Sequence, residues 1–140
     1  MNIAETLILD NEPFEVSRAA TWLDDLLGGA GLPPRVIAAL QVALEEVLNN
    51  ILCYGYADIE PHKIELRVAA DPSVAALEFF DDGIPFDPTH QEPLPPGPTV
   101  STRPGGLGLL FIRRVIDDIT YERVDDRNHL TLRKLVRKLV

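Results

Sequence analysis

The stretch Leu40–Tyr56, LQVALEEVLNNILCYGY, decides the fold, because it has the pattern of one long helix that carries a carboxylate and a carboxamide side by side. At about 100° per residue, its apolar positions form one stripe, as in a helix that packs on a core. Together with the preceding turn, this stripe contains Ile37, Leu40, Leu44, Val47, Leu48 and Ile51. Glu46 and Asn50 are four residues apart, so their side chains are neighbours on the nearly opposite side.

The side of the helix that carries Glu46 and Asn50 is not an ordinary solvent face. In place of the lysine, glutamate and arginine expected there, it also holds Ala39, Val42, Ala43 and Cys53. We therefore expect something other than water to cover this side. The helix would separate the hydrophobic core from a second compartment filled by a ligand, with Glu46 and Asn50 projecting into it.

The rest of the chain supplies strands and helices around this central helix, which we expect to run from about Pro34 to Cys53. Apolar alternation predicts strands, and apolar recurrence every three or four residues predicts helices. The predicted elements are a strand at Ile3–Leu9, a helix at Phe14–Leu27, strands at Lys63–Ala69 and Val74–Phe80 joined as a hairpin, a helix at Leu107–Ile116, a strand at Ile119–Val124, a turn at Asp125–Asn128 and a strand at His129–Val136. This order predicts one domain over residues 1–140: an α/β (α+β) two-layer sandwich with a mixed, mostly antiparallel sheet and three main helices on one face.

Composition and charge limit the classes of function. The 140 residues are 46% apolar, which excludes wholesale disorder, and the formal charge of −9 disfavours a nucleic-acid surface. The chain has no run of about 18 apolar residues, so we expect no membrane span. The N-terminal MNIAETLILDNEPFE lacks the basic region of a secretory signal, and Cys53 is the single cysteine, so a reducing cytoplasm is the expected location.

The segment Asp81–Gly106 differs from the rest, because seven of the chain's twelve prolines lie between Pro85 and Pro104. Such a stretch without periodic apolar residues is uncommon inside a compact domain unless it works as a lid or a binding loop. At its end, Gly105-Gly106-Leu107-Gly108 precedes an apolar helix, where free backbone N–H groups and the helix dipole favour an anion. The alternative interpretation of these glycines is a flexible hinge followed by a helix start.

Asp81 follows the apolar run Leu77-Glu78-Phe79-Phe80, where a carboxylate is partly buried and needs hydrogen bonds. Gly83 allows a flat ligand to approach the backbone, and a carboxylate can accept from the exocyclic amine of adenine. The alternative is an Asx turn that ends the strand. Asn50 offers a hard oxygen that could bind Mg²⁺, and Glu46 could act as a base toward a hydroxyl. The alternative is that both are ordinary helix residues.

Taken together and in this order, these segments resemble the ATP-binding fold of gyrase, Hsp90, histidine kinases and MutL, and in particular the anti-sigma factor serine/threonine kinases of bacteria. EEVLNNILCYGY resembles the N box of that family, DDGIPFD its first glycine box, RPGGLGLLFIRRVID its second, and YERVDDRNHLTLRK its closing hairpin. The chain departs from the pattern at Tyr54, where relatives often have histidine, and at Pro85, which replaces a glycine. The resemblance covers nearly the whole chain and implies a Bergerat-type fold with an ATP lid at about residues 82–105.

The resemblance also implies roles for individual residues. Glu46 corresponds to the general base and Asn50 to the magnesium ligand. Asp81 would bind the adenine amine, with Gly83 beneath the ring. The other nucleotide-binding positions that the resemblance implies are Arg103 at the end of the lid, Gly105, Gly106, Leu107 and Gly108 in the glycine turn, and Thr131 in the last strand.

Three hypotheses follow. The first, which the presence of Glu46 and Asn50 favours, is an Mg²⁺- and ATP-dependent serine kinase that acts as an anti-sigma regulator by partner switching. The resemblance implies a serine on an anti-anti-sigma (STAS-like) protein as the phosphate acceptor and a sigma factor as a further partner. It also allows a homodimer. The acidic charge and the lack of a long apolar run predict no direct contact with nucleic acid or membrane. The alternatives are a non-catalytic ATP-binding module that sequesters a partner and a simple ATPase.

Overall fold

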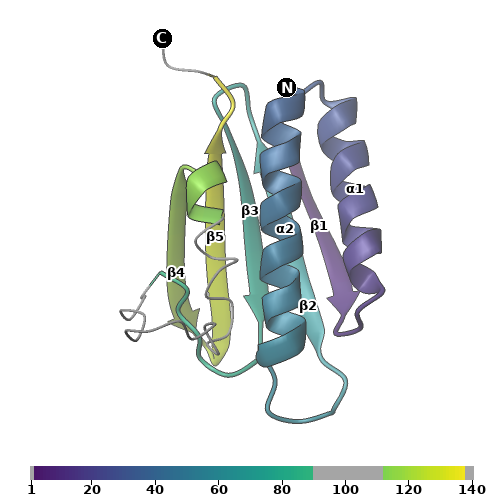
Figure 1. The fold of residues 1–140 in the computed structure, drawn as a ribbon, viewed down its shortest axis with the longest axis vertical. Helices are drawn as coiled ribbons and strands as arrows, with labels where there is room; N and C mark the ends of the chain where they lie inside the picture. Colours follow the sequence, from purple (N-terminus) through teal and green to yellow (C-terminus); the bar gives the residue numbers. More distant parts are fainter. Residues whose placement is uncertain (1, 90–111, 138–140) are drawn as a thin grey trace, which may run out of the picture.

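The structure is a computed structural model that describes residues 2–89 and 112–137, and it has two layers, a five-stranded sheet and a layer of helices (Figure 1). Its elements are β1 (Ile3–Asp10), α1 (Glu15–Gly29), α2 (Pro34–Tyr54), β2 (Lys63–Ala70), β3 (Val74–Asp81), β4 (Asp118–Val124) and β5 (Arg127–Leu135). The strands and helices predicted within the described residues are all present. The predicted helix at Leu107–Ile116 begins outside them, and residues 112–115 are helical.

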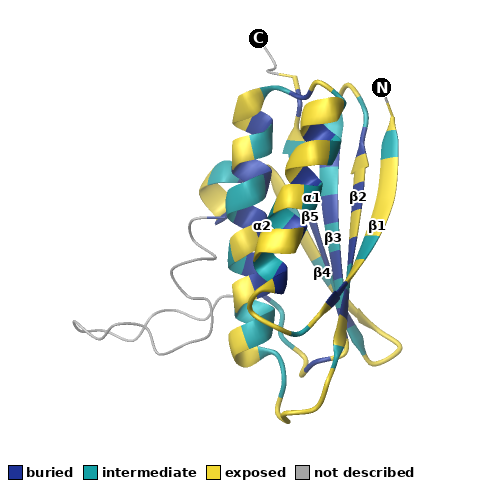
Figure 2. Cartoon of the chain, turned by 90° about the vertical axis from the view of Figure 1, so that its right-hand side faces the viewer, coloured by how far each residue is buried: buried dark blue, intermediate teal, exposed yellow. Residues whose placement is uncertain are grey.

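The five strands follow the order β1-β2-β3-β5-β4, and each neighbouring pair is antiparallel. Both long helices lie on one face of the sheet (Figure 2). The other face, called the open face below, carries no helix among residues 2–89 and 112–137. The alternation along β2 shows why: Ile64, Leu66 and Val68 are buried under the helices, whereas Lys63 and Arg67 are exposed. The expected two-layer sandwich is confirmed, and its described strand pairs are uniformly antiparallel where we expected a mixed, mostly antiparallel sheet.

The long helix α2 runs across the middle of the helical layer (Figure 1). Its residues with at most 3% exposure are Val36, Leu40, Ala43, Leu44, Val47 and Leu48. Ala43, and Ala39 with 8% exposure, are covered by other parts of the protein, and the expectation that a ligand covers these two residues is wrong. By length and hydropathy alone α2 could span a membrane, yet its apolar stripe belongs to the core of this domain.

The hairpin between β4 and β5 is tighter than the sequence suggested. Asp125 and Asp126 have φ values of 52° and 60°, so both residues occupy the left-handed region, as in a two-residue type I′ turn. Asn128 therefore belongs to β5, and the predicted turn at Asp125–Asn128 is too long. This register pairs Asn128 with Asp81 at the end of β3.

Candidate functional site

A pocket lies between the C-terminal half of α2, the end of β3 and the β4–β5 hairpin. It is lined by Val47, Asn50, Ile51 and Tyr54 of α2, Gly55, Phe79 and Asp81 of β3, Ile84, Phe86 and Pro88 of the next segment, Tyr121 of β4, and Asn128 and Leu130 of β5. Most of these residues are apolar, and a few polar groups converge among them from α2, β3, β4 and β5. An apolar pocket with a few convergent polar groups is typical of a small-molecule site.

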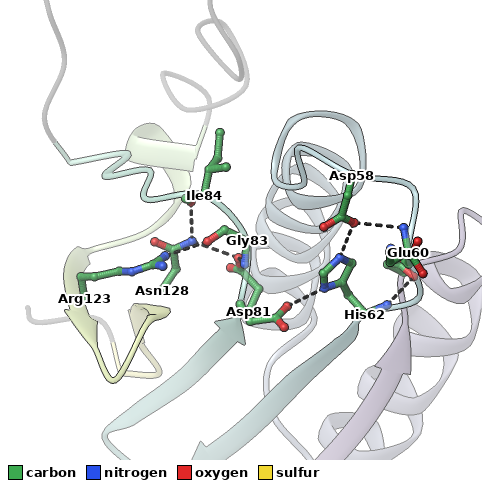
Figure 3. Close-up of polar contacts among 10 residues, drawn as sticks. Asp58, Glu60, His62, Asp81, Gly83, Ile84, Arg123 and Asn128 are labelled. Atoms are coloured by element: carbon green, nitrogen blue, oxygen red, sulfur yellow. Dashed lines mark hydrogen bonds and ion pairs between the residues drawn. The ribbon is translucent and has the colours of Figure 1, made fainter.

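Asp81 is the buried carboxylate of this pocket, with 5% of its surface exposed. Its Oδ1 accepts from the backbone N–H of Gly83 at 3.0 Å and from Nδ2 of Asn128 at 2.9 Å (Figure 3). Burial raises the pKa of Asp81, and these two hydrogen bonds oppose that rise. The described residues provide no donor to Oδ2. The Asx turn that was one interpretation of the sequence is therefore present, and it leaves the second oxygen available.

Gly83 is required by the close approach of two chain segments. A Cβ at this position would lie 2.1 Å from the carbonyl oxygen of Gly55, so a larger residue needs a backbone shift. The N–H of Ile84 donates to the same oxygen at 2.7 Å, which joins the end of α2 to the turn after β3. The sequence predicted that a flat ligand approaches Gly83, whereas the close approach in the structure is that of the Gly55 backbone. An approach of a ligand to Gly83 stays a prediction.

Glu46 and Asn50 lie on successive turns of α2, as the sequence predicted. Asn50 lines the pocket, and its side chain has no hydrogen-bond partner within residues 2–89 and 112–137. Glu46 is half-buried one turn earlier, next to Val47 of the pocket wall, and is not itself a lining residue. An uncommitted carboxamide oxygen on the wall fits Mg²⁺, which takes one or two protein oxygens together with phosphate and water. The two catalytic roles stay predictions.

Asn128 is a residue of this site that the sequence analysis missed. It is 6% exposed, and its Nδ2 donates both to Asp81 and, at 2.8 Å, to the carbonyl oxygen of Ile84. Its Oδ1 accepts from the N–H of Phe86 at 3.3 Å and from the hydroxyl of Tyr121. The neighbourhood DDRN has the composition of a turn, so only the register of the hairpin reveals the role of Asn128.

A polar cluster borders the turn that follows Asp81. The ring of His62 lies 2.7 Å from Asp58, as Figure 3 shows. Its other ring nitrogen lies 3.0 Å from Asp82, and the ring stacks on Tyr56 with ring centroids 4.1 Å apart. The hydrogen bond with Asp58 raises the pKa of His62, and the contact with Asp82 adds to this rise. Burial raises the pKa of Tyr56. The cluster holds the loop after α2 beside the end of β3.

Thr131 is not brought to the pocket. Along β5 the side chains alternate, and Asn128 and Leu130 point to the pocket while His129 and Thr131 point to the open face of the sheet. There the hydroxyl of Thr131 lies 3.3 Å from Nε2 of His129, which itself contacts Glu78 at 2.9 Å. We therefore leave Thr131 out of the proposed site.

The remaining predicted site residues lie outside the described residues, as does most of the expected lid. These residues are Arg103, Gly105, Gly106, Leu107 and Gly108. Their roles toward phosphate stay predictions.

Comparison with known proteins agrees with this arrangement. Residues 9–134 match the model of the histidine kinase-like ATPase domain family. The serine/threonine-protein kinase BtrW of Bordetella bronchiseptica is 29% identical to the chain over 129 residues, which cover 91% of each protein. The crystal structure of the RsbU and RsbW domains of a Mycobacterium tuberculosis protein matches over 97% of this chain, with a TM-score of 0.65 and 16% identity. This chain spans 33% of the length of that one, and the likeness concerns the fold alone.

Proposed function

Because the chain belongs to the histidine kinase-like ATPase domain family, we propose that it is an Mg²⁺- and ATP-dependent protein serine kinase that regulates a sigma factor by partner switching. The observation that carries the proposal is the apolar pocket lined by both Asp81 and Asn50. The likeness to a serine/threonine-protein kinase along 91% of both sequences supports phosphorylation of a protein over other uses of ATP.

In the proposed complex the adenine ring enters the apolar pocket beside Phe79, and its exocyclic amine donates to Oδ2 of Asp81. This oxygen suits that role because the donors found for the carboxylate all reach Oδ1. The triphosphate then extends along α2 toward Asn50 and Glu46. Binding of the base far from the reacting phosphorus fixes the position of the nucleotide, which lowers the entropic part of the barrier.

The chemical step is an in-line transfer of the γ-phosphoryl group to a serine hydroxyl of the partner. A bond forms between the serine oxygen and the γ-phosphorus, the bond from that phosphorus to the β–γ bridging oxygen breaks, and ADP leaves. Glu46 accepts the hydroxyl proton or orients the hydroxyl for attack. When bound, Mg²⁺ held by the Asn50 oxygen neutralises charge on the phosphates.

The acceptor in this proposal is a serine of an anti-anti-sigma (STAS-like) protein, and the unphosphorylated partner competes with a sigma factor for the kinase. Bacterial sigma factors act in the cytoplasm, so the proposal places this chain there. The net charge of −9 does not favour direct contact with nucleic acid. Regulation by protein contacts alone is consistent with that charge.

The test uses the full chain with [γ-³²P]ATP, Mg²⁺ and an anti-anti-sigma protein as the acceptor. Wild-type protein should yield phosphoserine, and Glu46→Gln should slow transfer by about 100-fold or more, the range for a lost general base, while ATP affinity stays within about threefold. Glu45→Gln is the matched control, because Glu45 is the exposed neighbour on the same helix. Equal transfer by Glu46→Gln and wild type would remove Glu46 from the mechanism.

Two other outcomes separate the alternative functions. Saturable ATP binding without transfer to any acceptor supports a non-catalytic module that presents a partner-binding surface. Release of free phosphate at several turnovers per minute without an acceptor supports a simple ATPase.

A further inference from the structure

We propose that Asn128 is the positioning residue that makes this pocket selective for a purine with an exocyclic amine, because it holds Asp81 with only Oδ2 open to the base. The inference rests on nucleotide binding as proposed above, but it concerns a different residue and a different property. It assigns to Asn128 the choice between an amine and a keto group on the ligand.

The first support is that the carboxamide of Asn128 is fully used and therefore cannot rotate. Its Nδ2 donates to Asp81 Oδ1 at 2.9 Å and to the carbonyl oxygen of Ile84 at 2.8 Å, as Figure 3 shows. Its Oδ1 accepts from the hydroxyl of Tyr121 and from the N–H of Phe86. A carboxamide has two N–H donors and one acceptor oxygen, and each of these groups has a partner.

The second support is that the neighbouring turn is held from the same hairpin. Arg123 is the register partner of Asn128 on β4, and its Nη1 donates to the carbonyl oxygen of Gly83 at 2.8 Å. The N–H of Gly83 donates to Asp81 Oδ1. The carboxylate is therefore fixed by two donors at Oδ1, and the turn that supplies one of them is anchored by Arg123.

The third support is electrostatic. Burial favours the protonated form of Asp81, and the hydrogen bond from Asn128 opposes it most strongly, ahead of the contributions of Gly83 and Arg123. Asp82 has the contrary effect, since its negative charge raises the pKa of Asp81. The hydrogen bond from Asn128 therefore favours the ionised form of the carboxylate.

Ionisation matters for selectivity because an ionised carboxylate only accepts hydrogen bonds. An amine at the facing position of a purine can donate to Oδ2, whereas a keto oxygen would place two acceptors against each other. A protonated Asp81 could instead donate to a keto oxygen, and a rotated Asp81 would no longer hold Oδ2 toward the base. Loss of Asn128 should therefore reduce the discrimination between the two bases, and not only weaken binding.

The experiment compares ATP with inosine triphosphate, which carries a keto group in place of the amine, by calorimetric titration with Mg²⁺ on the full chain. Wild type should bind ATP at least about tenfold more tightly than inosine triphosphate. Asn128→Leu should weaken ATP binding about tenfold and leave inosine triphosphate within about twofold, so the selectivity falls toward unity. The pH at which ATP affinity is half lost should rise in this variant.

Tyr121→Phe is the second variant, because it removes one donor to Asn128 and keeps the ring in the pocket wall. It should lower the ATP preference about two- to threefold, even if Asn128→Leu folds poorly. Thr120→Val, on the open face of β4, is the matched control and should leave the preference unchanged. Equal losses for both nucleotides in Asn128→Leu, or a wild type without preference, would overturn the inference. A folded wild type that binds neither nucleotide would instead overturn the proposed function.

Discussion

Two carboxylates of this protein have the same small exposed surface, and their pKa values shift in opposite directions. Glu15 at the start of α1 and Asp81 at the end of β3 are each 5% exposed. Hydrogen bonds from Arg18 and from the backbone N–H of Asp10 lower the pKa of Glu15 to about 2, whereas burial raises the pKa of Asp81. The exposed surface alone therefore does not set the pKa of a carboxylate, because the depth of burial and the hydrogen-bond partners both contribute.

The two carboxylates differ in the hydrogen bonds that their oxygens accept. Oε1 of Glu15 accepts from Nε of Arg18 at 2.8 Å, and Oε2 accepts from Nη2 at 2.7 Å and from the N–H of Asp10 at 2.9 Å. The same guanidinium also donates to the carbonyl oxygen of Ile8, which ties α1 to β1. Both oxygens of Glu15 thus accept hydrogen bonds within the protein. Within the described residues, Asp81 accepts hydrogen bonds only from neutral donors and only on Oδ1, so Oδ2 is left for a ligand.

The largest expected effect is on nucleotide binding and follows from a change at Asp81. In Asp81→Asn the Oδ1 acceptor for Gly83 and Asn128 is kept, but a donor replaces Oδ2. ATP affinity should fall about 10- to 100-fold, the value of a hydrogen bond to a charged group, and inosine triphosphate should become the better ligand. Calorimetric titration of both nucleotides measures this. Unchanged ATP affinity would show that Asp81 does not contact the base.

The same variant should not lose stability. The raised pKa of Asp81 means that folding disfavours the charged carboxylate relative to the unfolded chain. The cost to stability begins above the reference pKa of 3.8 and is complete above the folded pKa. Asn carries no such charge, and thermal unfolding of Asp81→Asn near neutral pH should occur at or above the wild-type temperature. A clear decrease would show that Asp81 is a structural group like Glu15.

The next effect is on stability and follows from a change at Glu15. Glu15→Gln removes the charged partner of Arg18, and the free energy of unfolding should fall by about 1–2 kcal/mol, a value that allows for solvent screening of the half-exposed Arg18. Urea titration of the variant and of wild type measures the change. Because Glu15 lies away from the pocket, ATP affinity of the folded variant should match wild type.

The pH dependence of stability gives a further test of the role of Glu15. The folded pKa of Glu15 is about 2 and the reference value 4.5, so its stabilisation is fully present above pH 4.5 and is lost as pH falls toward 2. Wild-type stability should therefore fall more steeply than that of Glu15→Gln across this window. Parallel curves for the two proteins would mean that Glu15 does not stabilise the fold through its charge.

The smallest effect concerns the contact between His62 and Asp82, an exposed residue that directly follows Asp81. The folded pKa of His62 is raised above 6.5, so its stabilisation is present below pH 6.5 and is lost as pH rises through the folded value. His62→Gln should shift the unfolding temperature at about pH 6 more than at about pH 8, by a few degrees at most. A larger shift at the higher pH would contradict this.

The sequence was sufficient for the elements and for two residues, Asp81 and Asn50, that line the pocket. The stripe of α2 predicted its buried face, and Asp81 and Asn50 were identified before any contact was known. Thr131 was expected at the nucleotide, but it does not line the pocket, because it lies three positions after Asn128 and therefore on the opposite face of β5. Ala39 and Ala43 were expected against a ligand and are covered by protein.

What this sequence determined by itself is local: which residues form helices and strands, where glycine and proline end them, and which polar side chains share one helix face. These properties follow from periodicity and from backbone geometry within a few residues. Only the tertiary structure decided that Asn128 holds Asp81 and that Gly55 occupies the space over Gly83. The physical reason is that hairpin register and the choice of hydrogen-bond partner depend on segments far apart in the chain.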